Sequence, residues 1–324
     1  MIDRTPGEHV AESFEIPNAM TGERLDRTVS MLYGITRERS GNLIDQGAVS
    51  INGQAVSKRS YRVLPSQTLS ANIEAIPDRA PVVETNPTPL DIVYFDAEVL
   101  VIDKRAGQVV HPGSGNATGT ISQGLLALFP EVHGVGQEGR SGVVHRLDKG
   151  TSGLMLLART EMAYSSLSRQ IANRDVGRTY IALVRGLVEF NSGVIDAPIS
   201  RSTKDPVKMA IASAGRAAVT NFTVLERIVS EESFTLLELR LETGRTHQIR
   251  VHLEAIGHSV VGDTAYRGKR FEGLGRPFLH SSKLSFQHPL DGRTLTFSSG
   301  LAKDLRSVLR QLGAAYDGQV IRPD

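Results

Sequence analysis

Cysteine and tryptophan are both absent from the 324 residues of this sequence. Without cysteine the chain can form no disulfide framework and no thiolate metal site, which is compatible with a reducing compartment. No apolar run approaches the roughly eighteen residues that a membrane-spanning helix needs, and the N-terminus lacks the pattern of a signal peptide. We therefore expect a soluble, cytoplasmic protein.

A strong charge of one sign is also lacking. The formal net charge is only +2, which by itself does not indicate a nucleic-acid-binding protein. The charges are unevenly spread, however: residues 140–180 hold seven Arg or Lys against three acids, whereas the first seventeen residues hold four acids and one arginine. A local basic surface attracts phosphate even on a nearly neutral chain, although a solvated charged face is the simpler interpretation of either segment alone.

The length of the chain predicts two domains, because one typical domain spans about 100–200 residues. Residues 1–17 are polar and acidic without periodicity, which predicts a flexible tail. A small domain is expected over residues 18–75. The four prolines of residues 76–90 predict an extended, semi-rigid linker, and residues 91–324 are expected to form the larger domain.

The small domain begins with a helical pattern. Leu25, Val29 and Leu32 fall on one face of a helix, and a second helix is expected to end at Gly47. Asn52-Gly53 then separates two short apolar runs, and this dipeptide favours the two-residue turn of a hairpin. The pattern predicts two helices followed by a hairpin.

The larger domain is predicted to be α+β, with helices flanking a mixed, mainly antiparallel sheet. It opens with a hairpin over residues 91–102, followed by a helix over residues 161–175 and a last helix with an apolar stripe over residues 301–312. Short apolar runs alternate with turns in between, and residues 234–241 are the clearest strand. This order favours an antiparallel or mixed sheet over a doubly wound one.

One more helix is expected after Thr246, which has the side chain of a helix cap. The spacing predicts that Ile249, Leu253 and Ile256 point inward and that the helix ends at Gly257.

The segment from Gly142 to Ala158 contains a single acid, Asp148. It lies between Val143-Val144 and Leu154–Ala158, each of which has the pattern of a short buried strand. An ionised carboxylate at the edge of a core is unfavourable unless a cation pairs with it. A functional carboxylate and an aspartate that only bonds its own turn are both compatible with these residues.

A resemblance to a known family is carried by four stretches of the larger domain. His145-Arg146-Leu147-Asp148, followed by Thr151-Ser152-Gly153, resembles the catalytic signature of the RluA family of pseudouridine synthases. The other three stretches resemble the family's upstream loop, its tyrosine strand, and its arginine loop and helix, in family order. They run from Val109 to Gly113, from Arg178 to Val184 and from Thr243 to Leu253.

The resemblance implies catalytic roles for three residues. Asp148 would act on the glycosidic bond as nucleophile or as base, and the sequence does not choose between the two. Tyr180 would stack on the uracil, and Arg245 would form the ion pair that keeps Asp148 ionised. Outside this context a tyrosine in a strand is more often a core residue, and an arginine beside a turn is more often solvated.

Arg146 resembles the family's arginine that helps to hold the target nucleotide out of its helix. Extruding a base costs a few kcal/mol, which a guanidinium in the vacated position would help to offset. A local pair with Asp148 is the alternative interpretation.

The small domain resembles the S-four RNA-binding domain, which often precedes pseudouridine synthase domains. The matching stretches are Arg24-Leu25-Asp26 and Leu43 to Gly53. A packing module without RNA contact is the alternative, because the charge excess of this domain is slight. The resemblance makes four basic residues candidate phosphate contacts: Arg37, Arg39, Lys58 and Arg59.

No metal and no cofactor are predicted. The histidines lack a metal-ligand spacing, and no phosphate-binding Gly-Lys-Ser/Thr element is present. RNA is the expected partner, and we expect a monomer without an obligate protein partner.

The resemblance implies isomerisation of specific uridines in RNA, and large-subunit ribosomal RNA is the expected target. A transfer-RNA-directed synthase and a catalytically silent RNA-binding factor for ribosome assembly are alternatives. A base-releasing hydrolase would want a second carboxylate near Asp148, and the motifs and their neighbourhood offer only Asp263 and Glu254.

We predict that Asp148→Asn abolishes isomerisation while it preserves the fold and much of the RNA affinity. The amide keeps the shape of the side chain but loses its charge and its nucleophilicity. The measurement is product formation by the purified variant together with its affinity for RNA. Substantial turnover would contradict the catalytic assignment, because a turn aspartate tolerates this change.

Overall fold

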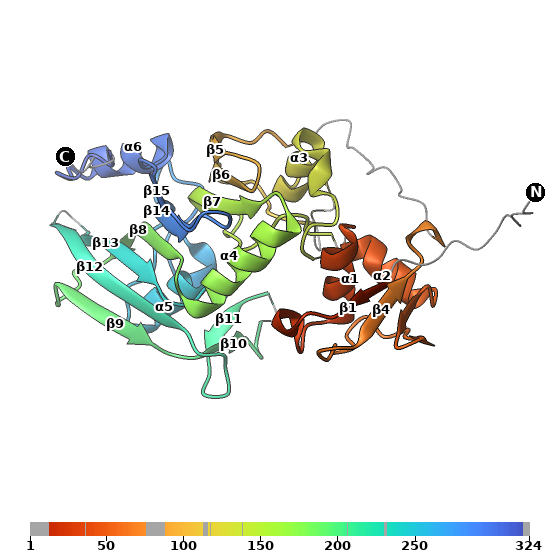
Figure 1. Cartoon of the computed structure of the whole chain (residues 1–324). Helices are drawn as coiled ribbons and strands as arrows, with labels where there is room; N and C mark the ends of the chain where they lie inside the picture. The colour runs from red at the N-terminus through yellow and green to blue at the C-terminus, as the bar shows by residue number, and fades with distance from the viewer. Residues whose placement is uncertain are drawn as a thin grey trace, which may run out of the picture.

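The computed structural model describes residues 13–35, 37–75, 88–112, 116, 118–137, 139–205, 207–229 and 232–319. An N-terminal unit of two helices and a small sheet lies beside a larger unit with a long sheet (Figure 1). Within these ranges no helix has both the length and the apolar composition that a membrane crossing requires.

The N-terminal unit is a small antiparallel sheet packed on two helices. The strand order is β1-β4-β2-β3. Leu25 and Val29 are fully buried between these elements, as the apolar spacing predicted, and Leu32, the third residue of that face, is half-buried against the same core. The elements are β1 (Ser13–Glu15), α1 (Leu25–Tyr33), α2 (Arg37–Asp45), β2 (Val49–Ile51), β3 (Gln54–Ala55) and β4 (Thr68–Ala71).

The predicted hairpin turn is confirmed. Asn52 and Gly53 both adopt positive φ angles, 50° and 78°, between β2 and β3. Asparagine and glycine tolerate this left-handed backbone better than other residues, which is why this dipeptide ends the strand here.

The prediction of a flexible tail over residues 1–17 is wrong at its C-terminal end. Ser13–Glu15 forms β1, which pairs with β4, and Ile16 is 1% exposed in the core of the small unit. A single buried isoleucine and three strand residues gave no periodicity to detect, because pairing with β4 is what orders them. Residues 1–12, and residues 76–87 of the predicted linker, lie outside the described residues.

The larger unit confirms the predicted mixed, mainly antiparallel sheet. Its strand order is β5-β6-β7-β14-β8-β13-β12-β9, and β15 pairs with β14. Among the described strands of this sheet, only the β7–β14 pair is parallel. The strands are β5 (Ile92–Phe95), β6 (Val99–Lys104), β7 (Ser152–Ala158), β8 (Gly177–Arg185), β9 (Ser192–Asp196), β12 (Val219–Ile228), β13 (Phe234–Leu241), β14 (Leu279–Gln287) and β15 (Thr294–Ser298).

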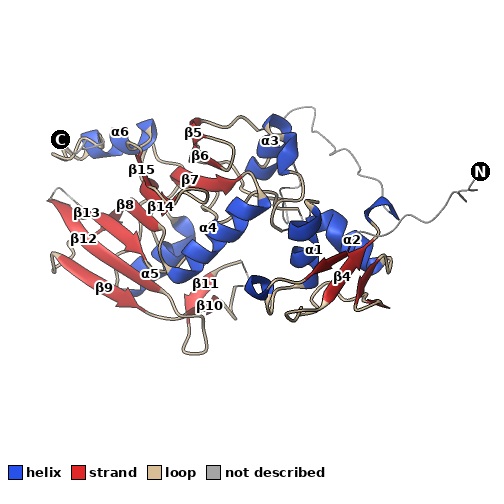
Figure 2. Ribbon diagram, in the orientation of Figure 1, coloured by secondary structure: helices blue, strands red, loops and turns tan. Residues whose placement is uncertain are grey.

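Helices pack against this sheet and a short hairpin extends from it. The predicted helix over residues 161–175 is α4, which contacts β7 and β14 (Figure 2). The hairpin of β10 (Ile199–Arg201) and β11 (Met209–Ile211) forms a separate two-stranded sheet beside α5. The helices are α3 (Ile121–Leu128), α4 (Glu161–Asn173), α5 (Gln248–Ala255) and α6 (Lys303–Gln311).

Two details of the predicted helix after Thr246 are wrong. Helix α5 is preceded by His247 in a left-handed conformation, and no side chain caps it. Ile256 follows the last helical residue and is 40% exposed, so that of the three predicted residues Ile249 and Leu253 are buried and Ile256 is not. Gly257 does end the helix, with a φ of 86°.

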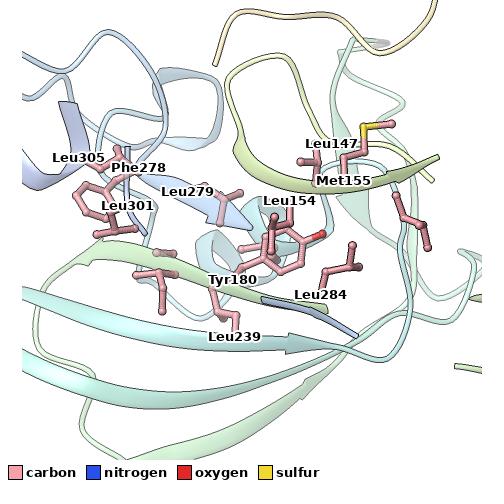
Figure 3. Packing of buried hydrophobic residues seen from close by; sticks show 14 of the residues in the cluster. Leu147, Leu154, Met155, Tyr180, Leu239, Phe278, Leu279, Leu284, Leu301 and Leu305 are labelled. Atoms are coloured by element: carbon pink, nitrogen blue, oxygen red, sulfur yellow. The ribbon is translucent and has the colours of Figure 1, made fainter. Parts of the chain in front are cut away.

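Val143-Val144 is not a strand, contrary to its apolar pattern. Val143 makes a single bridge to Leu157, and both valines are half-buried beside the fully buried β7. Figure 3 shows Leu154 and Met155 of β7 with Leu147 of the preceding loop in the core of the larger unit. Apart from this bridge, the loop from Val143 to Thr151 lies along β7 without forming a strand, and polar residues of the loop line a cleft.

We predict that deletion of residues 1–75 weakens RNA binding more than it slows the chemical step on saturating substrate. The nine-stranded sheet takes no strand from residues 1–75, so the strands that carry the predicted catalytic residues do not depend on them. A tethered module adds effective concentration and phosphate contacts. The measurement is the RNA dissociation constant and the single-turnover rate at saturation. An equal loss in both quantities would contradict this division of roles.

Candidate active site

A cleft of about 580 Å³ opens over the ends of β7, β8 and β13 and the start of α5. Its described lining holds seven arginines and only two carboxylates, Asp148 and Glu242. The cleft is therefore strongly cationic although the whole chain is nearly neutral, which fits an anionic ligand. The seven arginines are Arg140, Arg146, Arg174, Arg178, Arg216, Arg245 and Arg250.

Asp148 lies in this cleft at the end of the loop that precedes β7. Its side chain is 17% exposed, and its Oδ2 accepts a hydrogen bond from Arg250 Nη1 at 3.2 Å. The described hydrogen bonds of this carboxylate include none from its own turn, where Thr151 donates instead to the Asp148 backbone carbonyl. A turn aspartate would use its side chain locally, so the geometry favours a functional carboxylate.

Arg250 is held by a second carboxylate behind Asp148. Its Nε and Nη2 donate to both oxygens of Asp263 at 2.6 and 2.8 Å, and Asp263 is 1% exposed. The guanidinium also lies over the ring of Tyr266, 4.7 Å from its centroid. Burial disfavours the charged guanidinium, but the hydrogen bonds and charges of Asp263 and Asp148 outweigh it and raise the pKa of Arg250. Arg250 therefore remains charged beside Asp148.

The prediction that Arg245 pairs with Asp148 is wrong. Arg245 Nε donates to the carbonyl of Ala217 at 3.0 Å, and burial together with Arg216 and Arg174 lowers its pKa. Arg245 precedes α5 on the loop, whereas Arg250 is in the first turn of the helix and turns toward Asp148. The sequence offered one signal for Arg250: it follows the core residue Ile249 on the buried side of an amphipathic helix.

Tyr180 is placed by the middle of the sheet. It lies on β8 opposite Leu239 of β13 and Ser281 of β14, and it is 5% exposed at the floor of the cleft. Figure 3 shows Tyr180 within the buried cluster that also contains Leu154 and Leu239. Burial raises the pKa of Tyr180, and the charge of Asp148 adds to this effect. The hydroxyl is therefore protonated at neutral pH.

His247 faces Asp148 although the sequence did not single it out. Its Nε2 lies 3.9 Å from Asp148 Oδ1, and its Nδ1 is 2.7 Å from the hydroxyl of Tyr266, which accepts the backbone N–H of Met209. Burial lowers the pKa of His247, so the ring is neutral at neutral pH. When Tyr266 donates to Nδ1, the single ring proton lies on Nε2, the nitrogen that lies 3.9 Å from Asp148 Oδ1.

His247 also has a φ of 56°, a left-handed backbone that few residues other than glycine adopt. Such a conformation is unfavourable by about 1–3 kcal/mol and persists where the surroundings impose it, often at functional sites. The signal that could have found this residue is its place in the stretch from Thr243 to Leu253.

The predicted RNA-binding residues fall into two groups. Arg146 is exposed at the cleft, two residues before Asp148. The four basic residues of the small unit do not line the cleft. Three of them have partners within that unit: Arg37 with Asp26, Arg59 with Asp45, and Arg39 with the carbonyl of Ile73. Lys58 is exposed, and RNA contact by all five residues stays a prediction.

A water-activating second carboxylate is not available to Asp148 in the described cleft. Asp263 is buried and bonded through both oxygens to Arg250, and Glu254 pairs with Arg267 outside the cleft. Glu242 lines the cleft but pairs with Arg174 at 2.8 Å. This arrangement disfavours a base-releasing hydrolase. Among the described residues, no group of three or more His, Asp or Glu is arranged to hold a metal ion.

Comparison with known proteins matches two families to the two units. The family described as RNA pseudouridylate synthase matches residues 98–255, and the S4 domain matches residues 23–69. The chain is 39% identical over 291 residues to an uncharacterized RNA pseudouridine synthase of Bacillus subtilis, covering 90% of this chain and 94% of that protein. It is 37% identical over 314 residues to ribosomal large subunit pseudouridine synthase D of Zymomonas mobilis, covering 93% and 97%.

Solved structures agree with these relatives. Human RNA pseudouridylate synthase domain containing 4 aligns with a TM-score of 0.54 at 27% identity, covering 68% of this chain and 92% of that one. Human RNA pseudouridylate synthase domain containing 1 aligns with a TM-score of 0.52 at 27% identity, covering 73% and 97%.

We predict that Arg250→Met lowers the free energy of unfolding by about 3–5 kcal/mol, because it leaves the buried Asp263 and the adjacent Asp148 without their cation. Arg245→Met is the matched control, and it is expected to cost only about 1 kcal/mol, since it loses one hydrogen bond to a carbonyl. Denaturant unfolding of both variants measures the difference. A loss for Arg245→Met as large as that for Arg250→Met would contradict the assignment of the structural ion pair.

Proposed function

The chain belongs to the RNA pseudouridylate synthase family, and from this premise we propose that it isomerises uridines of large-subunit ribosomal RNA with Asp148 as the catalytic carboxylate. The observation that carries the proposal is the Asp148–Arg250 pair within an arginine-lined cleft. The relatives named ribosomal large subunit pseudouridine synthase D match this chain over nearly its whole length, which supports ribosomal RNA as the substrate.

The reaction breaks the bond from ribose to the ring nitrogen of uracil, turns the base and rejoins ribose to a ring carbon. A carboxylate serves such glycosidic chemistry because it can attack the anomeric carbon, stabilise positive charge there, or remove a neighbouring proton. Asp148 is partly exposed to the cleft, and its Oδ2 accepts a hydrogen bond from the charged guanidinium of Arg250. The carboxylate is therefore ready to act in either role.

Tyr180 supports the uracil base during these reaction steps. Its ring forms part of the apolar floor beneath Asp148, where a uracil can stack on it. The surrounding core restricts the ring, so a stacked base would turn on a rigid surface while the cleft keeps it from diffusing away.

Arg146 is suited to hold the nucleotide outside its helix. The side chain is exposed, lines the cleft and has no ion-pair partner among the described residues, including Asp148. The alternative of a local Arg146–Asp148 pair is therefore not favoured by the geometry. A free guanidinium at the rim can fill the position that an extruded base leaves in its stack.

The small domain is proposed to bind RNA outside the cleft. Arg37, Arg39 and Arg59 already have partners within the domain, so an RNA phosphate would bind these arginines alongside their present partners, whereas Lys58 is exposed.

We further propose a monomer that works in the cytoplasm, where ribosomal RNA is available. A catalytically silent assembly factor would not need Asp148, Arg250 and Tyr180 in one cleft.

We predict that cells without this gene lose pseudouridine at one or more positions of large-subunit ribosomal RNA. Chemical mapping of total RNA with and without the gene locates these positions. Wild-type protein is expected to restore them, and Asp148→Asn is expected to fail at equal expression. Loss confined to transfer RNA would contradict the proposed target, and an unchanged map would contradict the activity in the cell.

A further inference from the structure

Arg178 is a buried cation within the cleft. It lies on β8 two residues before Tyr180, and because side chains alternate along a strand, both residues lie on the same face of the sheet. Arg178 is 5% exposed, and its side chain contributes to the lining of the cleft. The guanidinium therefore lies beside the expected position of the target base.

Arg178 has no anionic partner among the described residues. The two carboxylates of the cleft are engaged elsewhere, Asp148 with Arg250 and Glu242 with Arg174. No hydrogen bond of the Arg178 side chain is present in the described structure, and its buried Nε lacks an acceptor. An unpaired buried guanidinium is unfavourable, and natural interiors rarely keep one without a function.

The neighbours of Arg178 leave room for its charge but do not neutralise it. A side chain at Gly244 would meet Arg178 Nη1, because a Cβ there would lie 2.7 Å from that atom. His145 is neutral, since burial, with the charge of Arg178 adding to it, lowers its pKa to about 3, and its Nε2 accepts the N–H of Leu156. Gly244 therefore leaves space for the Arg178 guanidinium, and the neutral His145 beside it carries no charge that could pair with it.

We propose that Arg178 is a substrate-binding residue that donates hydrogen bonds to a negatively charged oxygen of the target nucleotide. The inference rests on the proposed function, and it adds the chemical group of the substrate that would pair with the buried guanidinium of Arg178. The planar guanidinium matches oxyanions, to which it donates two parallel hydrogen bonds.

Two oxygens of the nucleotide have this chemistry. One belongs to a phosphate that flanks the target uridine and is charged before the reaction. The other belongs to the uracil ring, which gains negative charge if the electrons of the ribose–nitrogen bond stay on the base during cleavage. Binding of the first lowers the dissociation constant, and binding of the second accelerates the chemical step.

The test compares Arg178→Met with Arg240→Met in the full-length protein. Arg240 is an exposed arginine on the neighbouring strand, opposite Thr179, and it does not line the cleft. The substrate is a synthetic RNA fragment that carries a uridine located by the mapping experiment. We expect Arg178→Met to lose about 10- to 100-fold in RNA affinity or in single-turnover rate, and Arg240→Met to stay within about twofold of wild type.

Modified RNAs then distinguish the two oxygens. Neutral methylphosphonate linkages replace each flanking phosphate in turn, and thiouridine replaces either uracil oxygen by sulfur. If Arg178 binds a phosphate, one methylphosphonate weakens binding by wild type but not by Arg178→Met. If it binds the base, one thiouridine slows wild type but not the variant. Additive losses with every modified RNA would overturn the inference.

Gly244→Ala is a second variant that displaces Arg178 without removing it. The added methyl would push on the end of a flexible side chain, and Gly244 has no positive φ angle, so we expect the fold to persist. The same kind of loss as for Arg178→Met is expected. If wild type isomerises RNA and both variants match it, this inference fails alone; a wild type without activity on any RNA would instead contradict the proposed function.

Discussion

The site depends on one buried guanidinium held between two carboxylates. Arg250 is bonded through two nitrogens to the buried Asp263 and through a third to Asp148, and Tyr266 packs against its face. Asp263 fixes the orientation of Arg250, and Arg250 in turn places its positive charge beside Asp148, the carboxylate that faces the cleft. Separating Asp263 from Arg250 would leave an unpaired buried charge, which is strongly unfavourable. The position of Asp148 therefore depends on the packing of α5 on the sheet.

Around this pair the cleft is cationic, and its arginines are used in different ways. Arg250 and Arg174 are bound to carboxylates, Arg245 is bound to a backbone carbonyl, and Arg146 is exposed. Such a distribution separates the groups that maintain the site from those that remain available to a nucleic acid. RNA supplies the missing negative charge, so binding and neutralisation of the cleft are the same event.

The sequence alone does not distinguish which arginine pairs with Asp148. Arg245 and Arg250 both belong to the stretch that resembles the family's arginine loop and helix, and residue type alone does not separate them. The choice follows from the backbone: His247 adopts a left-handed conformation, α5 starts one residue later, and this start turns Arg250 inward.

Local patterns in the sequence determined much of the protein: the helices with apolar faces, the Asn52-Gly53 turn, the clearest strand and the mainly antiparallel sheet. Resemblance in short motifs identified Asp148 and Tyr180 as residues to examine, because their neighbours along the chain carry the signal. Only the tertiary structure decided the partners. Arg250 lies 102 residues from Asp148 along the chain, β1 is ordered by β4, and Val143-Val144 lies beside β7 without becoming a strand. Ion pairs and strand pairing between distant segments depend on how the whole core packs, which spacing along the chain does not encode.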